Sequence, residues 1–244
     1  MNKNLITDDI NKLLLLLLEN GYLVDYKPAI IRDNLADNML AITWVDAPHS
    51  LFNILYGEHA TIPEYRHLIE NRYYHGLLFD GAIIQFGCLF QNGEFIKHRF
   101  WYYPCPVKFS DDIITDFQTN EDVLLYFDDH LSKEAEQIQS CVKKTDFSNY
   151  RGHFRMVTPI RFDFDLKAQK KGHSASHMTL LNKECRIPVY GPISVGHFAR
   201  FIFKNFYPSI WEKLSDLQQH RLTFINRSIL QEETQDLYFD SSFR

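Results

Sequence analysis

The clearest hydrophobic pattern is a pair of mostly apolar runs, Gly81–Phe90 and Glu94–Tyr103, on either side of an Asn92-Gly93 pair. An Asn-Gly pair between two such runs is typical of a β-hairpin, because both residues tolerate the positive φ angles of a type I′ turn. The two runs are therefore predicted to be antiparallel strands. Pro104 ends the second strand, since proline lacks the N–H that strand pairing uses.

A second strand-rich region begins after residue 154. Strands are predicted at Arg155–Leu166, Ala175–Leu181 and Cys185–Tyr190, and their short connections favour a three-strand meander. In the first of them Arg161, Asp163 and Asp165 alternate with Phe162 and Phe164. Because successive side chains of a strand point to opposite faces, one face of this sheet should be aromatic and the other polar. The polar face is the first candidate for a functional site.

The first predicted helix starts with Thr7 or Asp8 as its cap and stops near Gly21. It carries six successive leucines, Leu13–Leu18, and is therefore apolar on every side. Such a helix is expected to be buried in the core. The alternative is a helix that docks on a partner.

Four further helices are expected. One begins at Pro63, one spans Asp122–Gln139, and one is capped by Ser194 and broken at Tyr207-Pro208. The last follows this break through Trp211, Leu214 and Leu217. Helices at the N-terminus, in the middle and at the C-terminus, combined with a hairpin and a meander, predict an α+β fold with an antiparallel sheet. We expect a single domain over residues 1–230 and a polar, acidic tail over residues 231–244.

Composition narrows the function classes. The chain has 244 residues and a formal net charge of −5, which argues against wide, sequence-independent binding of nucleic acid, although a local basic groove remains open. Its four cysteines form no C-x-x-C pair, which is typical of a reducing compartment. The leucine run is too short to span a bilayer and lacks the features of a signal peptide. We therefore expect a cytoplasmic protein without a membrane segment.

The paired carboxylates of Asp163 and Asp165 carry the first chemical hypothesis. They can act as acid and base, or can bind a divalent cation through oxygen ligands, although no cofactor is specified by the sequence. Ion pairing of Arg161 with a neighbouring carboxylate on a solvated face is the simpler interpretation.

Two histidines, His173 and His177, follow in the sequence G-H-S-A-S-H. Neutral imidazole can move protons or bind metals, but no C-x-x-C completes a zinc site. His177-Met178-Thr179 has the H-x-T form of two-histidine phosphoesterases, without a second copy. Arg186, at the start of the third strand, and Arg161 and Thr179 are candidates for binding a ligand or phosphate. Histidines bonded to carboxylates of the adjacent strand, with a purely structural role, are the alternative.

The order of Arg161–Asp165, His173–His177, Arg186–Pro188 and Phe198–Pro208 resembles that of an uncharacterised bacterial family, domain of unknown function 2290. The family pattern often has His-Pro where this chain has His173-Ser174. The resemblance covers about the C-terminal third specifically and implies little about activity. It suggests a cytosolic accessory protein, and by analogy alone a setting in mobile elements or phage defence.

Two hypotheses follow. In the first, the protein is an interaction or regulatory subunit of a bacterial multi-protein system, antiviral defence included, and its partner is another protein subunit. In the second, it is an enzyme that processes a phosphodiester or nucleotide. There His177 is the base and His173 its partner or the acid, Asp163 and Asp165 orient or bind metal, and Arg186 holds phosphate. The first is favoured because the sequence contains no complete catalytic motif.

Overall fold

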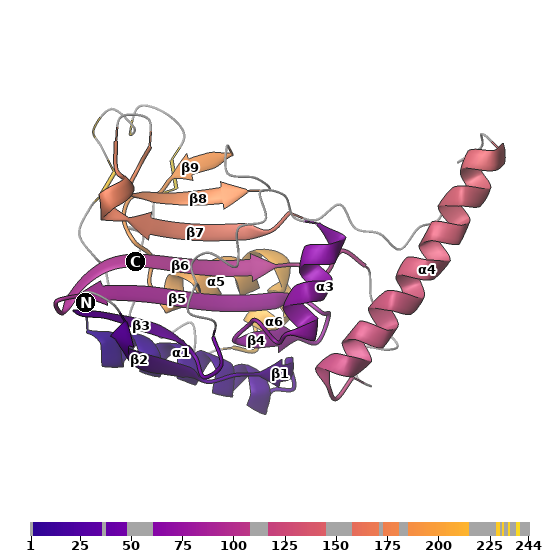
Figure 1. Ribbon diagram of the computed structural model, residues 1–244, viewed down its shortest axis with the longest axis horizontal. Coiled ribbons are helices and arrows are strands. Elements are labelled where there is room, and N and C mark those ends of the chain that lie inside the picture. Colours follow the sequence, from indigo (N-terminus) through magenta and orange to yellow (C-terminus); the bar gives the residue numbers. More distant parts are fainter. Residues whose placement is uncertain are drawn as a thin grey trace.

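The computed structural model describes residues 2–35, 38–47, 61–107, 117–144, 158–170, 173–180 and 185–214, and, near the C-terminus, residues 228, 229, 231, 234, 238 and 239. Its main feature is a nine-stranded antiparallel sheet with helices on both faces (Figure 1). This confirms the predicted α+β class.

The strands are β1 (Leu23–Tyr26), β2 (Ala29–Leu35), β3 (Met39–Trp44), β4 (Gly76–Leu78), β5 (Ile83–Gln91), β6 (Glu94–Tyr103), β7 (Ile160–Asp165), β8 (Ser176–Leu180) and β9 (Arg186–Pro188). They follow the order β1-β4-β5-β6-β7-β8-β9, and β3, which pairs with β2, joins the second half of β5. Every pair of these strands is antiparallel.

The predicted hairpin and meander are both present. Asn92 and Gly93 connect β5 to β6 with φ angles of 51° and 81°, as a tight hairpin turn requires. β7, β8 and β9 pair in sequence order, and β7 also pairs with β6. The hairpin and the meander thus share one sheet.

The helices are α1 (Lys3–Glu19), α3 (Ile62–Glu70), α4 (Asn120–Lys144), α5 (Val195–Phe206) and α6 (Pro208–Trp211), and a 3-10 turn, η2, covers Leu166–Ala168. The cap predicted for α1 was wrong. The helix begins earlier because the Asn2 side chain accepts a hydrogen bond from the Asn4 backbone N–H at 2.9 Å. Thr7 lies inside the helix, where its hydroxyl donates to the Lys3 carbonyl. Ser194 caps α5 as predicted, and Leu217 lies outside the described residues.

The leucine run of α1 is buried on one side only. Leu13, Leu14 and Leu17 are in the core, whereas Leu15 is 52% exposed and Leu18 is 37% exposed. The expectation of a helix buried on every side was therefore wrong. A helix that lies on the face of a sheet contacts it along one stripe, and the opposite side faces away.

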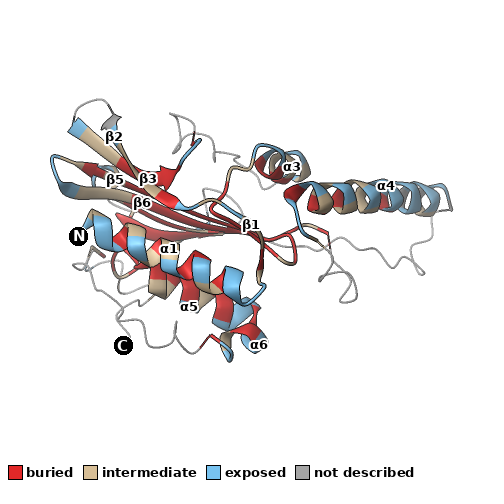
Figure 2. Cartoon of the chain, turned by 90° about the horizontal axis from the view of Figure 1, so that it is seen from below, coloured by how far each residue is buried: buried red, intermediate tan, exposed pale blue. Residues whose placement is uncertain are grey.

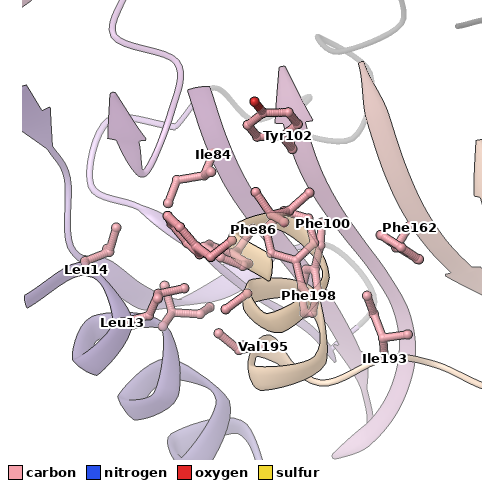
Figure 3. Packing of buried hydrophobic residues seen from close by; sticks show 14 of the residues in the cluster. Leu13, Leu14, Ile84, Phe86, Phe100, Tyr102, Phe162, Ile193, Val195 and Phe198 are labelled. Carbon is pink, nitrogen blue, oxygen red and sulfur yellow. The ribbon is translucent and has the colours of Figure 1, made fainter. Parts of the chain in front are cut away.

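Helices α1 and α5 lie together on one face of the sheet and enclose the main core (Figure 2). Phe198 of α5 packs against Phe86, Phe100 and Phe162 with ring centroids 5.3, 5.9 and 6.2 Å apart (Figure 3). These aromatic pairs are edge-on, which suits the quadrupoles of the rings. The aromatic face predicted from strand parity is therefore the core face.

The opposite face of the sheet is covered at one end by α3 and the beginning of α4. Leu68 of α3 and Phe127 of α4 belong to a second core cluster with Ile83 and Trp101 of the sheet. From there α4 extends away from the sheet (Figure 1). In the described part of the chain no helix combines the length and apolarity needed to cross a membrane.

The sequence after residue 230 was predicted to be a polar tail. Of its described residues, Phe239 lies beside β9, where its backbone N–H donates to the Pro188 carbonyl at 2.7 Å. Its ring packs edge-on against Phe162 and Phe201. This residue therefore contributes to the main core.

Candidate functional site

The register of β6, β7 and β8 aligns polar residues on the face opposite α5. Arg99, Asp163 and His177 lie directly opposite one another on these three strands. We call them the Asp163 row. A second row lies two residues away along β7 and β8. It consists of Arg161 on β7, Thr179 on β8 and Arg186 on β9, and we call it the Thr179 row. Directly opposite residues of antiparallel strands share a face and have Cβ atoms about 5 Å apart, so the side chains of each row are neighbours.

Asp163 is the centre of a buried ion-pair network. Its Oδ1 accepts from Arg99 Nε at 2.7 Å, and its Oδ2 accepts from Arg161 Nε at 2.5 Å. Burial disfavours the charged carboxyl, but the charges of Arg99 and Arg161 outweigh that effect and hold the pKa of Asp163 well below its ordinary value. The carboxylate is therefore permanently charged near neutral pH, and both of its oxygens are engaged.

His177 is neutral near pH 7. Burial lowers the pKa of its imidazole to about 4, and the nearby charge of Asp163 opposes this shift only in part. Its Nδ1 lies 3.2 Å from the Ser174 carbonyl oxygen, which can only accept, so the neutral ring carries its proton on Nδ1. Nε2 lies 3.6 Å from Asp163 Oδ2, beyond hydrogen-bond length, and presents a lone pair.

The carboxylate of Asp165 is bound by neighbouring residues. Its Oδ2 lies 2.9 Å from Lys97 Nζ on the adjacent strand, and its Oδ1 accepts from the Lys167 backbone N–H at the start of η2. Each of the two predicted carboxylates, Asp163 and Asp165, therefore carries at least one cationic partner. No group of three His, Cys, Asp or Glu side chains within the described ranges is arranged to bind a metal ion.

His173 lies beside His177 but outside the strands. Its ring centroid is 5.2 Å from that of His177, and its Nδ1 lies 2.9 Å from the Ala168 carbonyl oxygen. The carbonyl again accepts, so this contact orients the ring from η2. The two predicted histidines are thus neighbours at the end of the Asp163 row.

The Thr179 row combines a buried hydroxyl with an open edge. Thr179 is 5% exposed, and its Oγ1 has no hydrogen-bond partner among the described residues. Arg161 is half-buried beside it, and Arg186 is exposed on β9, the last strand of the sheet. The row therefore leads from a buried polar atom to solvent.

Sequence reasoning identified seven residues of this site, and the structure brings them together: Asp163, Asp165, His173, His177, Arg161, Thr179 and Arg186. It did not include Arg99 and Lys97, which pair with the two carboxylates from β6. The signal was the alternation of Lys97, Arg99 and Trp101 along the second strand of the hairpin. That stretch forms β6, and its alternation puts these three side chains on the polar face.

A separate apolar pocket of about 500 Å³ lies between β1, the residues that connect it to α1, and the α5–α6 junction. Its walls include the side chains of Tyr22, Phe79, Phe206, Tyr207 and Ile210. Phe206 is 45% exposed. The Tyr207 hydroxyl lies within 3.1 Å of both carboxylate oxygens of Asp80.

The family model of the uncharacterized conserved protein DUF2290 matches residues 23–241. The chain belongs to this family. The match includes the whole polar face of the sheet and most of the described fold, and the family's function is unknown. Neither the curated proteins nor the solved structures contain a match to this DUF2290 protein.

Proposed function

We propose that this DUF2290 protein is an interaction or regulatory subunit of a bacterial multi-protein system. The proposal includes systems that defend the cell against phage. An apolar surface at the end of α1 binds the partner protein, and the polar face of β6–β9 binds a ligand. The observation that carries the proposal is the exposure of Leu15 and Leu18 on a helix whose other leucines form the core.

The apolar surface has the composition of a protein interface. Leu15 and Leu18 are one helical turn apart, so they share one side of α1. The chain continues from this helix into Gly21 and Tyr22, which line the aromatic pocket. Exposed leucine and aromatic side chains grouped beside a hollow are typical of surfaces that bind another protein.

The polar face favours binding over catalysis. Both oxygens of Asp163 are engaged by arginines, so this carboxylate is a poor proton acceptor. An imidazole whose pKa is lowered to about 4, as in His177, is a weak general base at neutral pH. Cationic side chains around a fixed carboxylate instead suit recognition of a charged ligand.

Affinity purification from the native host tests the interaction. Leu18→Asp and Phe206→Asp should abolish a stoichiometric complex measured by mass, because each puts a charge into the apolar surface. Leu5→Asp is the matched control, since Leu5 is also an exposed leucine of α1, 45% exposed, near its other end. A complex that survives Leu18→Asp and Phe206→Asp, or that Leu5→Asp disrupts equally, contradicts the proposed surface.

A phosphodiester- or nucleotide-processing enzyme is the second candidate, and the lone pair on His177 Nε2 favours it. A chromogenic phosphodiester, assayed with and without Mg²⁺, provides the test. Hydrolysis that His177→Gln abolishes, and that His67→Gln on the exposed side of α3 retains, supports the enzyme. Equal rates in the two variants and in a protein-free blank exclude this activity for the site.

A further inference from the structure

The Thr179 hydroxyl is a buried polar group on β8. The residue is 5% exposed, and its Oγ1 lacks a hydrogen-bond partner among the described residues. Leaving such a group buried and unpaired costs roughly 1–3 kcal/mol. Valine has nearly the same shape and avoids this cost, so a ligand that accepts a hydrogen bond from this hydroxyl would remove the penalty.

Cationic side chains flank this hydroxyl on both sides. Arg161 lies directly opposite Thr179 on β7, and Arg186 lies directly opposite it on β9. The charge of Arg186 also contributes to the lowered pKa of His177, which places its guanidinium near the Asp163 row. Thr179 is therefore a hydroxyl donor between two arginines.

The charges on this face do not cancel. Along β6–β9 the residues whose side chains share the face include four cations, Lys97, Arg99, Arg161 and Arg186, and three carboxylates, Glu94, Asp163 and Asp165. The strands thus give this face a surplus of one positive charge, although the whole chain has a net charge of −5. Asp163 is paired with Arg99 and Arg161, and Asp165 with Lys97, so Arg186 is the cation of this face that lies outside these three ion pairs.

We propose that the Thr179 row binds the dianionic phosphate of a phosphate monoester. The Thr179 hydroxyl donates to one phosphate oxygen, and Arg186 reaches another from the open edge. Arg161 supplies positive charge while it remains bonded to Asp163. This inference deepens the ligand-binding part of the proposed function, on which it rests.

The chemistry of the row selects a monoester over related anions. A monoester near pH 8 has two negative charges and three terminal oxygens, which suit the two arginines and the hydroxyl of the row. A carboxylate or an internal phosphodiester carries one charge and offers fewer oxygens. A small phosphate ester and the phosphorylated end of an oligonucleotide share the required group, and the experiment separates them.

Calorimetric titration of the full chain with inorganic phosphate at pH 8 and constant ionic strength is the direct test. We expect saturable binding that Thr179→Val weakens roughly 10- to 100-fold, the effect of one hydrogen bond to a charged group. Thr43→Val is the matched control, because Thr43 is 1% exposed and its Oγ1 also lacks a partner among the described residues. It lies on β3, outside the row, and should leave the affinity unchanged.

Arginine variants give a second, independent comparison. Arg186→Gln should weaken phosphate binding about tenfold, whereas Arg200→Gln, on the exposed side of α5, should not change it. Both are surface changes, so folding is retained and a negative result stays interpretable. No saturable phosphate binding, or equal loss in Arg186→Gln and Arg200→Gln, overturns the proposal.

The source of the phosphate follows from three further titrations. AMP bound with the same sensitivity to Thr179→Val indicates a small phosphate ester, and a 5′-phosphorylated oligonucleotide bound more tightly indicates a nucleic acid end. An unphosphorylated oligonucleotide that binds equally well overturns the monoester. Partner binding is measured separately with the Leu18 variant, so failure of the phosphate site and failure of the subunit role are distinguishable.

Discussion

On the face of β6 and β7 turned toward α5, Phe100 and Phe162 pack edge-on against Phe198. On the other face of β6, β7 and β8, Arg99, Asp163 and His177 are also buried, but they are held by directional bonds. Apolar burial stabilises a fold without demanding a particular partner, whereas a buried charge is tolerated only when it is paired. The core face therefore explains the fold, and the polar face, held by its ion pairs, is where we propose that a ligand binds.

The largest change in the free energy of unfolding is expected from a substitution in the core face. Phe198→Ala removes a ring that is 1% exposed and contacts three other phenylalanines, so it should lower the free energy of unfolding by about 4 kcal/mol. Urea denaturation measures the change. Phe206→Ala on the same helix removes a ring that is 45% exposed, and should cost less than about 1 kcal/mol.

A substitution at the centre of the polar face is expected to cause a smaller loss of stability. Asp163→Asn leaves Arg99 and Arg161 without their buried counter-charge, and should lower the free energy of unfolding by about 3 kcal/mol. Asp165→Asn is the control, since that carboxylate is partly exposed and should cost about 1 kcal/mol or less. Equal effects of the two changes contradict the central position of Asp163.

Acid should destabilise the protein through its buried histidines. Burial lowers the pKa of His75 and His98 to about 3 and that of His177 to about 4. Their contribution to stability is complete above the unfolded pKa of about 6.5 and is lost as the pH falls below it, because only the unfolded chain takes up the protons. Each histidine should add up to about 1.4 kcal/mol per pH unit to this loss.

Urea denaturation between pH 7.5 and pH 5 measures that slope. His98→Phe removes one of the three buried imidazoles and should reduce the slope by the contribution of one proton. His67→Gln changes an exposed histidine of α3 and should leave it as in the wild type. A wild-type slope that His98→Phe does not change argues against a neutral, buried His98.

The smallest stability effect belongs to the Thr179 row. Thr179→Val should change the free energy of unfolding by less than about 0.5 kcal/mol, or increase it, because it removes a buried hydroxyl without a partner among the described residues. The measurement is again urea denaturation, with Thr43→Val as the comparison. If Thr179→Val lowers the free energy of unfolding by several kcal/mol and Thr43→Val does not, the Thr179 hydroxyl makes a structural hydrogen bond.

The sequence predicted those parts of the fold whose pattern is local. The Asn92-Gly93 turn and the alternation around Phe162 and Phe164 were sufficient for the hairpin and for the two faces of β7. The strands β1, β2, β3 and β4 were missed, because their sequence patterns are mixed, and β1 and β3 also pair with strands distant in the chain. The ion pair of Asp163 with Arg99 spans 64 positions, so only the register of the folded sheet reveals it.

The most direct test of a functional polar face is the unfolding temperature with and without inorganic phosphate at pH 8 and constant ionic strength. Binding to the folded state alone should raise the wild-type unfolding temperature by about 3 °C at ten times the dissociation constant. At the same phosphate concentration the rise should largely disappear in Thr179→Val and persist in Thr43→Val. No rise in the wild type, or the same rise in both variants, would contradict a phosphate site on the Thr179 row.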